Sequence, residues 1–116
     1  MTKYIKEISE PWFSLIKLGI KKCEGRLNKG DFLKMKKGDI ITFKNDNLGF
    51  IRTFNVKITS IHYYDTFKSY LLNEKLDICL PGIDTIEQGI NIYYKYYKKE
   101  DEITYKIVAI LVKRIK

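Results

Sequence analysis

The sequence contains one histidine, two cysteines and two prolines in 116 residues, and no apolar run approaches the roughly twenty residues of a membrane helix. His62, Cys23 and Cys79 lack the paired spacing of a zinc site, so we expect no metal and no other cofactor. The first residues lack the apolar stretch of a signal peptide, which indicates an intracellular protein, away from membranes, whose cysteines are free thiols. No linker, repeat or low-complexity block divides the chain, which predicts a single domain over residues 1–116.

Acidic residues are in the minority. The sequence has 22 lysines and arginines against 14 acidic residues, which gives a formal net charge of +8. Such a surplus favours a polyanionic partner, because each cation that meets a phosphate releases counterions. The chain is also rich in Ile, Lys, Asn and Tyr, whose codons are A/T-rich, so part of the lysine excess is attributable to genome composition. The same bias fits an A/T-rich genome, for example that of a large DNA virus.

The first half of the chain predicts a short helix followed by extended segments. Ser9 suits the cap of this helix, Pro11 suits its first turn, and Gly19 suits its end. The alternation of apolar residues and the turn-forming cluster Asn-Asp-Asn-Leu-Gly then predict a β-hairpin. The extended segments are residues 20–27, 40–44 and 50–62, with the turn at 45–49.

The second half predicts two more short helices and a final strand. Asp65 suits the cap of one helix, and Asp84 with Glu87 suits a capping box for the other. Residues 103–115 predict a strand whose centre is apolar on both faces and therefore deeply buried. Together the elements predict an α+β fold, in which a mostly antiparallel sheet closes into a small barrel with about three short helices. The basic residues at the chain end read as a loose tail: Lys113, Arg114 and Lys116.

Residues 19–26, Gly-Ile-Lys-Lys-Cys-Glu-Gly-Arg, contain the pattern Gly-x-Lys-x-x-Glu-x-Arg. This pattern resembles the signature of the ASCH domain (activating signal cointegrator homology), a member of the PUA-like β-barrel superfamily. Residues 11–16 resemble the helix that precedes the signature in that family, and residues 37–43 resemble the Gly-Asp strand that follows it. The resemblance covers nearly the whole chain and implies a PUA-like barrel with a cleft beside the first helix.

The resemblance implies a module that binds RNA, other single-stranded nucleic acid or nucleotides, with Lys21, Glu24 and Arg26 in or near a basic cleft. An arginine fork and a lysine suit phosphate, and a carboxylate accepts hydrogen bonds from the exocyclic amine of a base. Lys22 shares a strand face with Glu24 and Arg26, so we also assign it a phosphate contact, and Trp12 is expected to wall the pocket. In the alternative reading, Glu24 and Arg26 form an ion pair that only holds the strand.

Catalysis is a second hypothesis, and we favour it less than binding. Some small bacterial family members that resemble this chain hydrolyse acetylated cytidine with a threonine nucleophile at the position of Glu24. This chain keeps the activating lysine as Lys21, but a carboxylate is a weak nucleophile toward an amide, so we do not expect the same mechanism. A metal-free nuclease that uses Lys21 and Glu24 remains open, as does a minor role for the Cys23 thiol. A third hypothesis is a protein-interaction domain with an ordinary charged surface.

Residues 93–99, Tyr-Tyr-Lys-Tyr-Tyr-Lys-Lys, interleave aromatic side chains with lysines. This pattern is typical of proteins that bind single-stranded nucleic acid. Helical spacing, however, places Tyr93 or Tyr94 and Tyr97 in a buried stripe with Ile86 and Ile90. We therefore interpret the segment as a solvated helix end.

Overall fold

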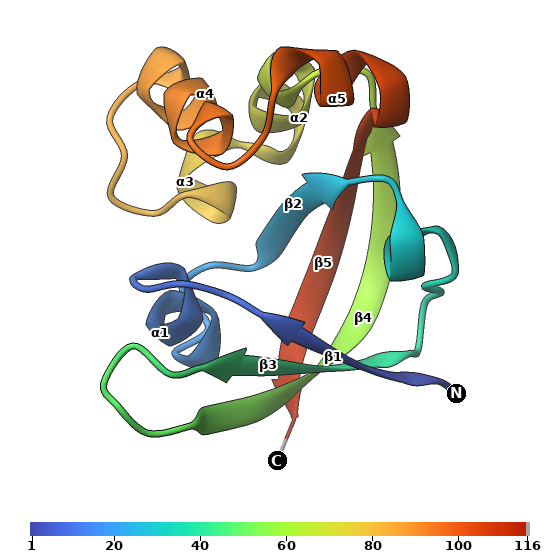
Figure 1. The fold of residues 1–116 in the computed structure, drawn as a ribbon, viewed down its shortest axis with the longest axis vertical. Helices are drawn as coiled ribbons and strands as arrows, with labels where there is room; N and C mark the ends of the chain where they lie inside the picture. The colour runs from blue at the N-terminus through green and yellow to red at the C-terminus, as the bar shows by residue number, and fades with distance from the viewer. Residues whose placement is uncertain (116) are drawn as a thin grey trace.

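A computed structural model describes residues 1–115, which form one strongly curled five-stranded sheet with short helices packed against it (Figure 1). The strand order is β1-β3-β4-β5-β2. β1 runs parallel to β3, and the other neighbouring pairs are antiparallel. The predicted α+β fold with a mostly antiparallel sheet is confirmed. The strands are β1 (Lys3–Glu7), β2 (Cys23–Leu27), β3 (Ile40–Asn45), β4 (Arg52–Tyr64) and β5 (Ile107–Ile115).

The helices outnumber the three that the sequence predicts. Residues 1–115 contain α1 (Trp12–Lys17), the 3-10 turn η1 (Gly30–Leu33), α2 (Phe67–Glu74), α3 (Leu76–Cys79), α4 (Ile86–Tyr94) and α5 (Lys99–Tyr105). None of these helices is long and apolar enough to cross a membrane.

The prediction of a strand from residue 103 is wrong at its start, because α5 occupies the first residues of that segment. The first turn of α5 carries three acidic side chains, which stabilise a helix N-terminus. One of them, Glu102, is buried and accepts hydrogen bonds from the Phe67 backbone N–H and the Tyr94 hydroxyl. Lys106, at φ 62°, ends the helix, and β5 begins at the next residue.

The caps of α2 and α4 lie one residue after their predicted positions, and the N-cap of α1 is Pro11 rather than Ser9. Thr66, not Asp65, caps α2 by accepting from the Ser69 N–H. Thr85 forms the capping box of α4 with Gln88, in place of Asp84 and Glu87. At α1 the Glu10 side chain, rather than that of Ser9, accepts from the Ser14 N–H at 2.9 Å.

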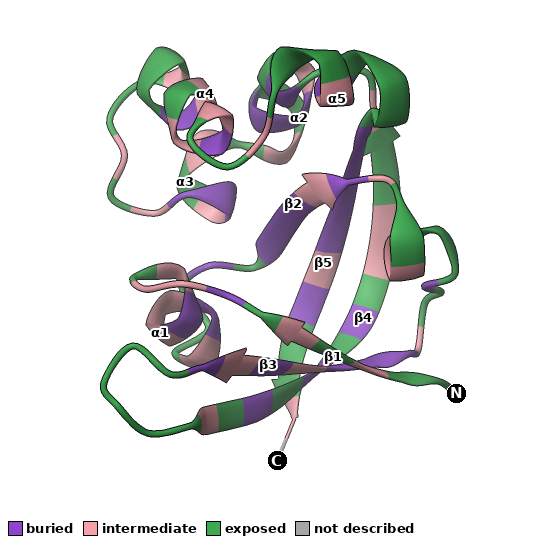
Figure 2. Cartoon of the chain, in the orientation of Figure 1, coloured by how far each residue is buried: buried purple, intermediate pink, exposed green. Residues whose placement is uncertain are grey.

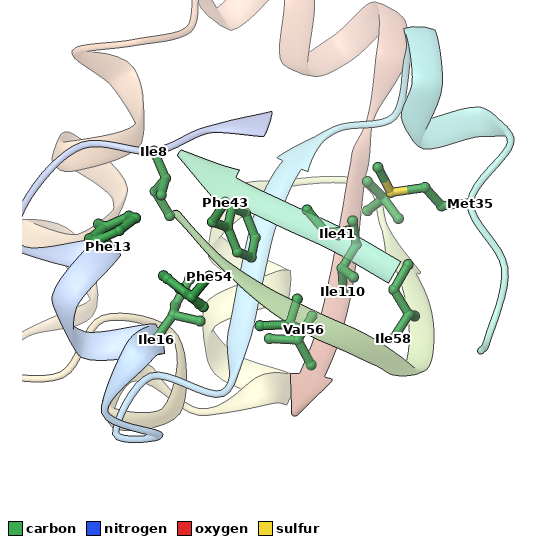
Figure 3. Packing of buried hydrophobic residues seen from close by; sticks show 12 residues of the cluster. Ile8, Phe13, Ile16, Met35, Ile41, Phe43, Phe54, Val56, Ile58 and Ile110 are labelled. Atoms are coloured by element: carbon green, nitrogen blue, oxygen red, sulfur yellow. The ribbon is translucent and has the colours of Figure 1, made fainter. Parts of the chain in front are cut away.

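Two apolar clusters form the core, and they lie on opposite faces of β5, because its alternate residues contribute to each: Val108, Ile110 and Val112 to the first, Ile107 and Ala109 to the second. The first lies between α1 and the β3–β4 hairpin, where Phe54, Val56 and Ile58 share one buried face of β4, in line with the predicted alternation of apolar residues (Figure 3). The second lies between β5, β2 and helices α2 to α4. The first four residues of β5, 107–110, are fully buried, in the apolar stretch that was predicted to be buried, and Figure 2 shows that exposure returns towards the C-terminal end of the strand.

The curled sheet leaves a seam between its two edge strands, β1 and β2. The pattern of the sequence does not predict β1, because its five residues are only half-buried or exposed. Arg26 of β2 reaches across the seam and donates from Nη2 to the carbonyl of Glu7, at the end of β1, at 2.9 Å. A side chain, rather than a strand ladder, therefore joins the two edges.

The chain end is not a loose basic tail over its described part. Lys113 and Arg114 belong to β5, where they lie opposite Lys57 and Val56 of β4. Lys116 lies outside the described residues.

Candidate ligand-binding cleft

A cleft of about 290 Å³ opens beside α1, at the end of the seam. Residues 24–26 of β2 form its floor, and the segment after α4 and the turn between β3 and β4 form its rim. Ser9 Oγ and Tyr96 Oη approach to 3.3 Å across one side. The residues that line the cleft include Ser9, Trp12, Lys21, Glu24, Gly25, Arg26, Asn45, Asn47, Tyr93, Tyr96 and Tyr97.

Glu24 stands between two cations on the cleft floor. Its Oε1 lies 3.3 Å from Lys21 Nζ, and its Oε2 accepts a hydrogen bond from Arg26 Nε at 2.8 Å. The structure therefore brings together the Lys, Glu and Arg residues of the Gly-x-Lys-x-x-Glu-x-Arg pattern on the floor of the cleft. These three residues are ion-paired with one another and also line the cleft. A structural ion pair and a ligand-binding role, the two interpretations of the sequence, are therefore compatible. We call this group the Lys21–Glu24–Arg26 triad.

Lys21 is the most deeply buried member of the triad, with 1% of its surface exposed. Its ammonium donates to the carbonyls of Cys23, at 2.6 Å, and of Cys79. With Glu24 as third partner, these bonds occupy all three N–H donors of a lysine. A phosphate contact would require one of them to break, so the geometry favours a positioning role for Lys21.

The charges around Glu24 keep it ionised. Burial by itself would raise the pKa of the Glu24 carboxyl, but the charges of Arg26 and Lys21 outweigh burial and hold this pKa below its usual 4.5. Glu24 in turn raises the pKa of Arg26 against the effect of burial. A carboxylate has about four acceptor positions, so Glu24 retains acceptor capacity toward a ligand.

Aromatic side chains form the walls of the cleft. Trp12 is half-buried, and its ring lies 5.7 Å from Lys21 Nζ. Tyr96 and Tyr97 face the cleft because α4 ends at Tyr94 and the chain turns there. The interpretation of residues 93–99 as only a solvated helix end therefore missed wall residues, and their aromatic and lysine pattern was the signal that pointed to them.

Lys22 does not line this cleft. Its side chain is exposed and lies in a separate hollow on the other side of Lys21. The strand alternation that grouped Lys22 with Glu24 and Arg26 does not apply, because β2 begins only at Cys23. Asn45 and Asn47, which do line the cleft, belong to the turn cluster that sequence analysis treated as a connection.

Gly25 lets the cleft floor lie against the core. A Cβ added at this position would lie 2.6 Å from both Cε2 and Oη of Tyr70, which is closer than real Cβ atoms approach their neighbours. The Tyr70 hydroxyl is 2.9 Å from that of Tyr93, which also lines the cleft. Only a residue without a side chain fits between Tyr70 and the cleft.

The charges that line the cleft are balanced. Lys21, Arg26 and Lys44 are positive, and Glu7, Glu24 and Asp46 are negative. The surplus of eight positive charges in the sequence is therefore not located in this cleft.

The other reactive side chains considered in the sequence lie outside the cleft. Cys23 is fully buried, and both its hydrogen bond with Cys79 and its burial raise the pKa of the Cys23 thiol. This thiol is therefore poorly placed to act as a nucleophile. His62 Nδ1 lies 2.7 Å from Glu74 Oε2, which also accepts from the Tyr64 hydroxyl, so His62 is engaged elsewhere.

Replacing Glu24 with glutamine is expected to lower the free energy of unfolding by about 3 kcal/mol at neutral pH, and by less as the pH falls below the ordinary carboxyl pKa of 4.5. The folded-state pKa of Glu24 lies below the unfolded one. Its contribution to stability is therefore present above the unfolded pKa and is lost as the pH falls through the folded pKa. Urea unfolding of both proteins across this range measures the difference. A difference that does not shrink on acidification would contradict this account.

Comparison with known proteins identifies the family. A family model described as "ASCH domain" matches residues 7–116. The crystal structure of the hypothetical protein PH0355 is 36% identical, covers 98% of this chain and 100% of its own, and superimposes with a TM-score of 0.89. The solution NMR structure of protein PF0455 from Pyrococcus furiosus is 33% identical, covers 99% of both chains, and gives a TM-score of 0.80. No curated protein matches significantly. The chain belongs to the ASCH domain family, as its Gly-x-Lys-x-x-Glu-x-Arg pattern and its PUA-like fold indicate.

Proposed function

We propose that the cleft binds one nucleoside unit of RNA or of a free nucleotide. The observation that carries the proposal is the Lys21–Glu24–Arg26 triad at the foot of an aromatic-walled cleft. ASCH domains are associated with nucleic-acid binding in general, which gives this reading its starting point. A cleft of about 290 Å³ also suits one base with its sugar better than a longer stretch of chain.

The walls supply stacking surfaces. Trp12 on one side and Tyr96 and Tyr97 on another present aromatic groups to the cleft. Stacking of a base on an aromatic side chain contributes about 1–3 kcal/mol and tolerates any base, because every base has a π-face. The walls therefore account for affinity rather than for selectivity.

The floor supplies polar selectivity. Glu24 accepts hydrogen bonds at its remaining lone pairs, and an exocyclic amine of cytosine or adenine is a suitable donor. Arg26 uses Nε and Nη2 within the protein, and its partly exposed guanidinium has further N–H groups to offer an acceptor of the base or sugar. Since the lining charges balance, the floor suits the uncharged base and sugar better than a phosphate. We accordingly expect cytidine and adenosine to bind more tightly than uridine.

The enzyme hypothesis gains no specific support from the cleft. Position 24 carries a carboxylate whose pKa is held low by two cations, which makes it a weak base as well as a weak nucleophile. Glu74, the acidic residue of α2, is engaged with His62 and Tyr64 outside the cleft. We therefore carry the binding proposal forward alone.

Trp12 is the only tryptophan of the chain, so its fluorescence reports directly on the cleft. Titration with cytidine, adenosine, uridine and their 5′-monophosphates is expected to change the Trp12 emission in a saturable way. The cytosine and adenine compounds should bind more tightly than the uracil compounds. Replacing Trp12 with leucine keeps the apolar contact but removes the stacking surface. Calorimetry is then expected to show at least about tenfold weaker binding, which corresponds to the lower end of the stacking energy.

Tyr63→Leu is the matched control for Trp12→Leu. Tyr63 is an exposed aromatic near the far end of β4, and it does not line the cleft. Its replacement should leave nucleoside affinity unchanged. The proposal is wrong if no nucleoside, nucleotide or short RNA produces a saturable signal, or if Tyr63→Leu weakens binding as much as Trp12→Leu does.

A further inference from the structure

A second hollow, of about 380 Å³, lies on the other side of Lys21 from the cleft. Its charged side chains are those of Lys21, Lys22, Lys113 and Arg114, and the lining contains no acidic residue. The β-bulge of β4 at Thr59 contributes to its shape, since a bulge bends the strand away from its partner. We call this hollow, together with the neighbouring Lys57, the basic groove.

Three segments of the sequence carry basic but no acidic residues, and each contributes residues to the basic groove. Residues 11–23, 47–64 and 103–116 contain nine lysines and arginines and no aspartate or glutamate. The remaining residues carry 13 basic and 14 acidic side chains, so they are nearly neutral. Besides Lys21, four of these nine cations belong to the groove: Lys22, Lys57, Lys113 and Arg114. Lys21, Arg52 and Lys106 are paired with carboxylates.

The cations of the basic groove are close to one another in the sheet. Lys57 and Lys113 lie directly opposite on antiparallel strands, a placement that destabilises a sheet unless an anion is present. The Val112 N–H donates to the carbonyl of Lys22 at 3.0 Å, which holds Lys22 beside the same end of β5. Figure 1 shows this end of β5 at the same end of the molecule as α1.

The side chains of Lys22, Lys57 and Lys113 are available to a ligand. All three are exposed, and none forms an ion pair with a residue in the described part of the chain. Arg114 is more constrained, because it donates to the Lys17 carbonyl at 3.2 Å and stacks over Phe54. Three free ammonium groups around an apolar-floored hollow suit a chain of anionic groups that carries apolar surface between them.

We infer that the basic groove binds the phosphate backbone of a single-stranded RNA, separately from the nucleoside cleft. The inference rests on the proposed function, since it supplies the phosphate contacts that the neutral cleft lacks. Lys21 lines both hollows from its buried position between them, so the two sites lie within one side chain of each other, and we expect a single RNA strand to reach both. The cleft then selects a base, and the groove contributes affinity that does not depend on sequence.

The test is the triple variant Lys22→Gln, Lys57→Gln, Lys113→Gln, with a fluorescein-labelled single-stranded 12-nucleotide RNA as probe. Each phosphate contact to a single strand contributes about 0.7 to the slope of log affinity against log salt. Loss of three contacts is expected to reduce that slope by about 2 and to weaken binding about tenfold or more at low salt. Nucleoside titration of Trp12 fluorescence should be unchanged, because none of the three residues lines the cleft.

The control is Lys34→Gln, Lys68→Gln, Lys75→Gln, which removes the same charge from exposed positions outside both hollows. This control variant should retain most of the salt dependence of RNA affinity that the wild-type protein shows. Equal loss in both triple variants, or no loss in the groove variant, overturns the inference. Binding of wild-type protein to phosphatidylserine vesicles but not to the RNA also overturns it.

The two proposals can fail separately. If nucleosides still change Trp12 fluorescence while the groove variant binds RNA as tightly as the wild type does, only the groove inference is wrong. If no nucleoside binds but RNA binding is lost in the groove variant, the proposed function of the cleft is wrong and the groove stands as an RNA-backbone site.

Discussion

Replacing Gly25 with alanine is expected to lower the free energy of unfolding by at least about 3 kcal/mol, or to prevent folding. The added methyl carbon would lie 2.6 Å from two atoms of Tyr70 and closer still to a third. Tyr70 has no room to move, because it is fully buried and its hydroxyl is held by that of Tyr93. Urea or thermal unfolding followed by far-ultraviolet circular dichroism measures the loss.

Gly89→Ala is the matched control. Gly89 is also buried, and an added Cβ there would lie 2.9 to 3.2 Å from methyl groups of three leucines. These are the flexible ends of side chains, and alanine gains about 1 kcal/mol over glycine inside a helix such as α4. The net effect should therefore be small. If Gly25→Ala is as well tolerated as Gly89→Ala, the packing of the cleft floor against Tyr70 is not as described.

The Gly25 contact also bears on the cleft. If a Gly25→Ala protein folds by displacing Tyr70, the hydrogen bond to Tyr93 is broken, and Tyr93 lines the cleft. Nucleoside affinity should then fall with stability. Stability and nucleoside affinity are coupled because one face of β2 forms the cleft floor while the other face packs against the core.

The strands of the hairpin and the buried face of β4 could be predicted because alternation and turn residues are local signals. β1 could not, since its five residues have no clear buried face and its position depends on pairing with β3, more than thirty residues away in the chain. α5 could not either. Its apolar residue Ile103 reads as strand, and its helical state depends on Glu102 reaching Phe67 and Tyr94.

The residues of the cleft likewise divide into those that local sequence signals predict and those that depend on tertiary contacts. Lys21, Glu24 and Arg26 could be placed together because a short motif carries them on one strand and its approach. Tyr96 and Tyr97 reach the cleft only because α4 ends at Tyr94, a tertiary fact that helical spacing does not contain. The bonding of Lys21 was equally out of reach, since the Cys79 carbonyl that it contacts lies 58 residues away.

Replacing Lys21 with methionine is expected to destabilise the protein by about 3–5 kcal/mol and to abolish detectable nucleoside binding. Methionine has a similar length but no charge or donor. The carbonyls of Cys23 and Cys79 would be left without this partner inside the protein, and Glu24 would keep only Arg26. Chemical unfolding and the Trp12 titration measure the two effects. Lys22→Met, an exposed neighbour, should change stability by no more than about 0.5 kcal/mol.

A double-mutant cycle separates the charge pair from the carbonyl contacts of Lys21. If Lys21 serves Glu24, the combination Lys21→Met with Glu24→Gln should cost at least about 1 kcal/mol less than the sum of the single changes, because no unpaired buried carboxylate remains. Strict additivity would mean that Lys21 stabilises only the backbone around Cys23 and Cys79. A Lys21→Met protein that folds and still binds nucleosides would show that the orientation of Glu24 does not depend on Lys21, and the triad would then lose its place in the proposed function.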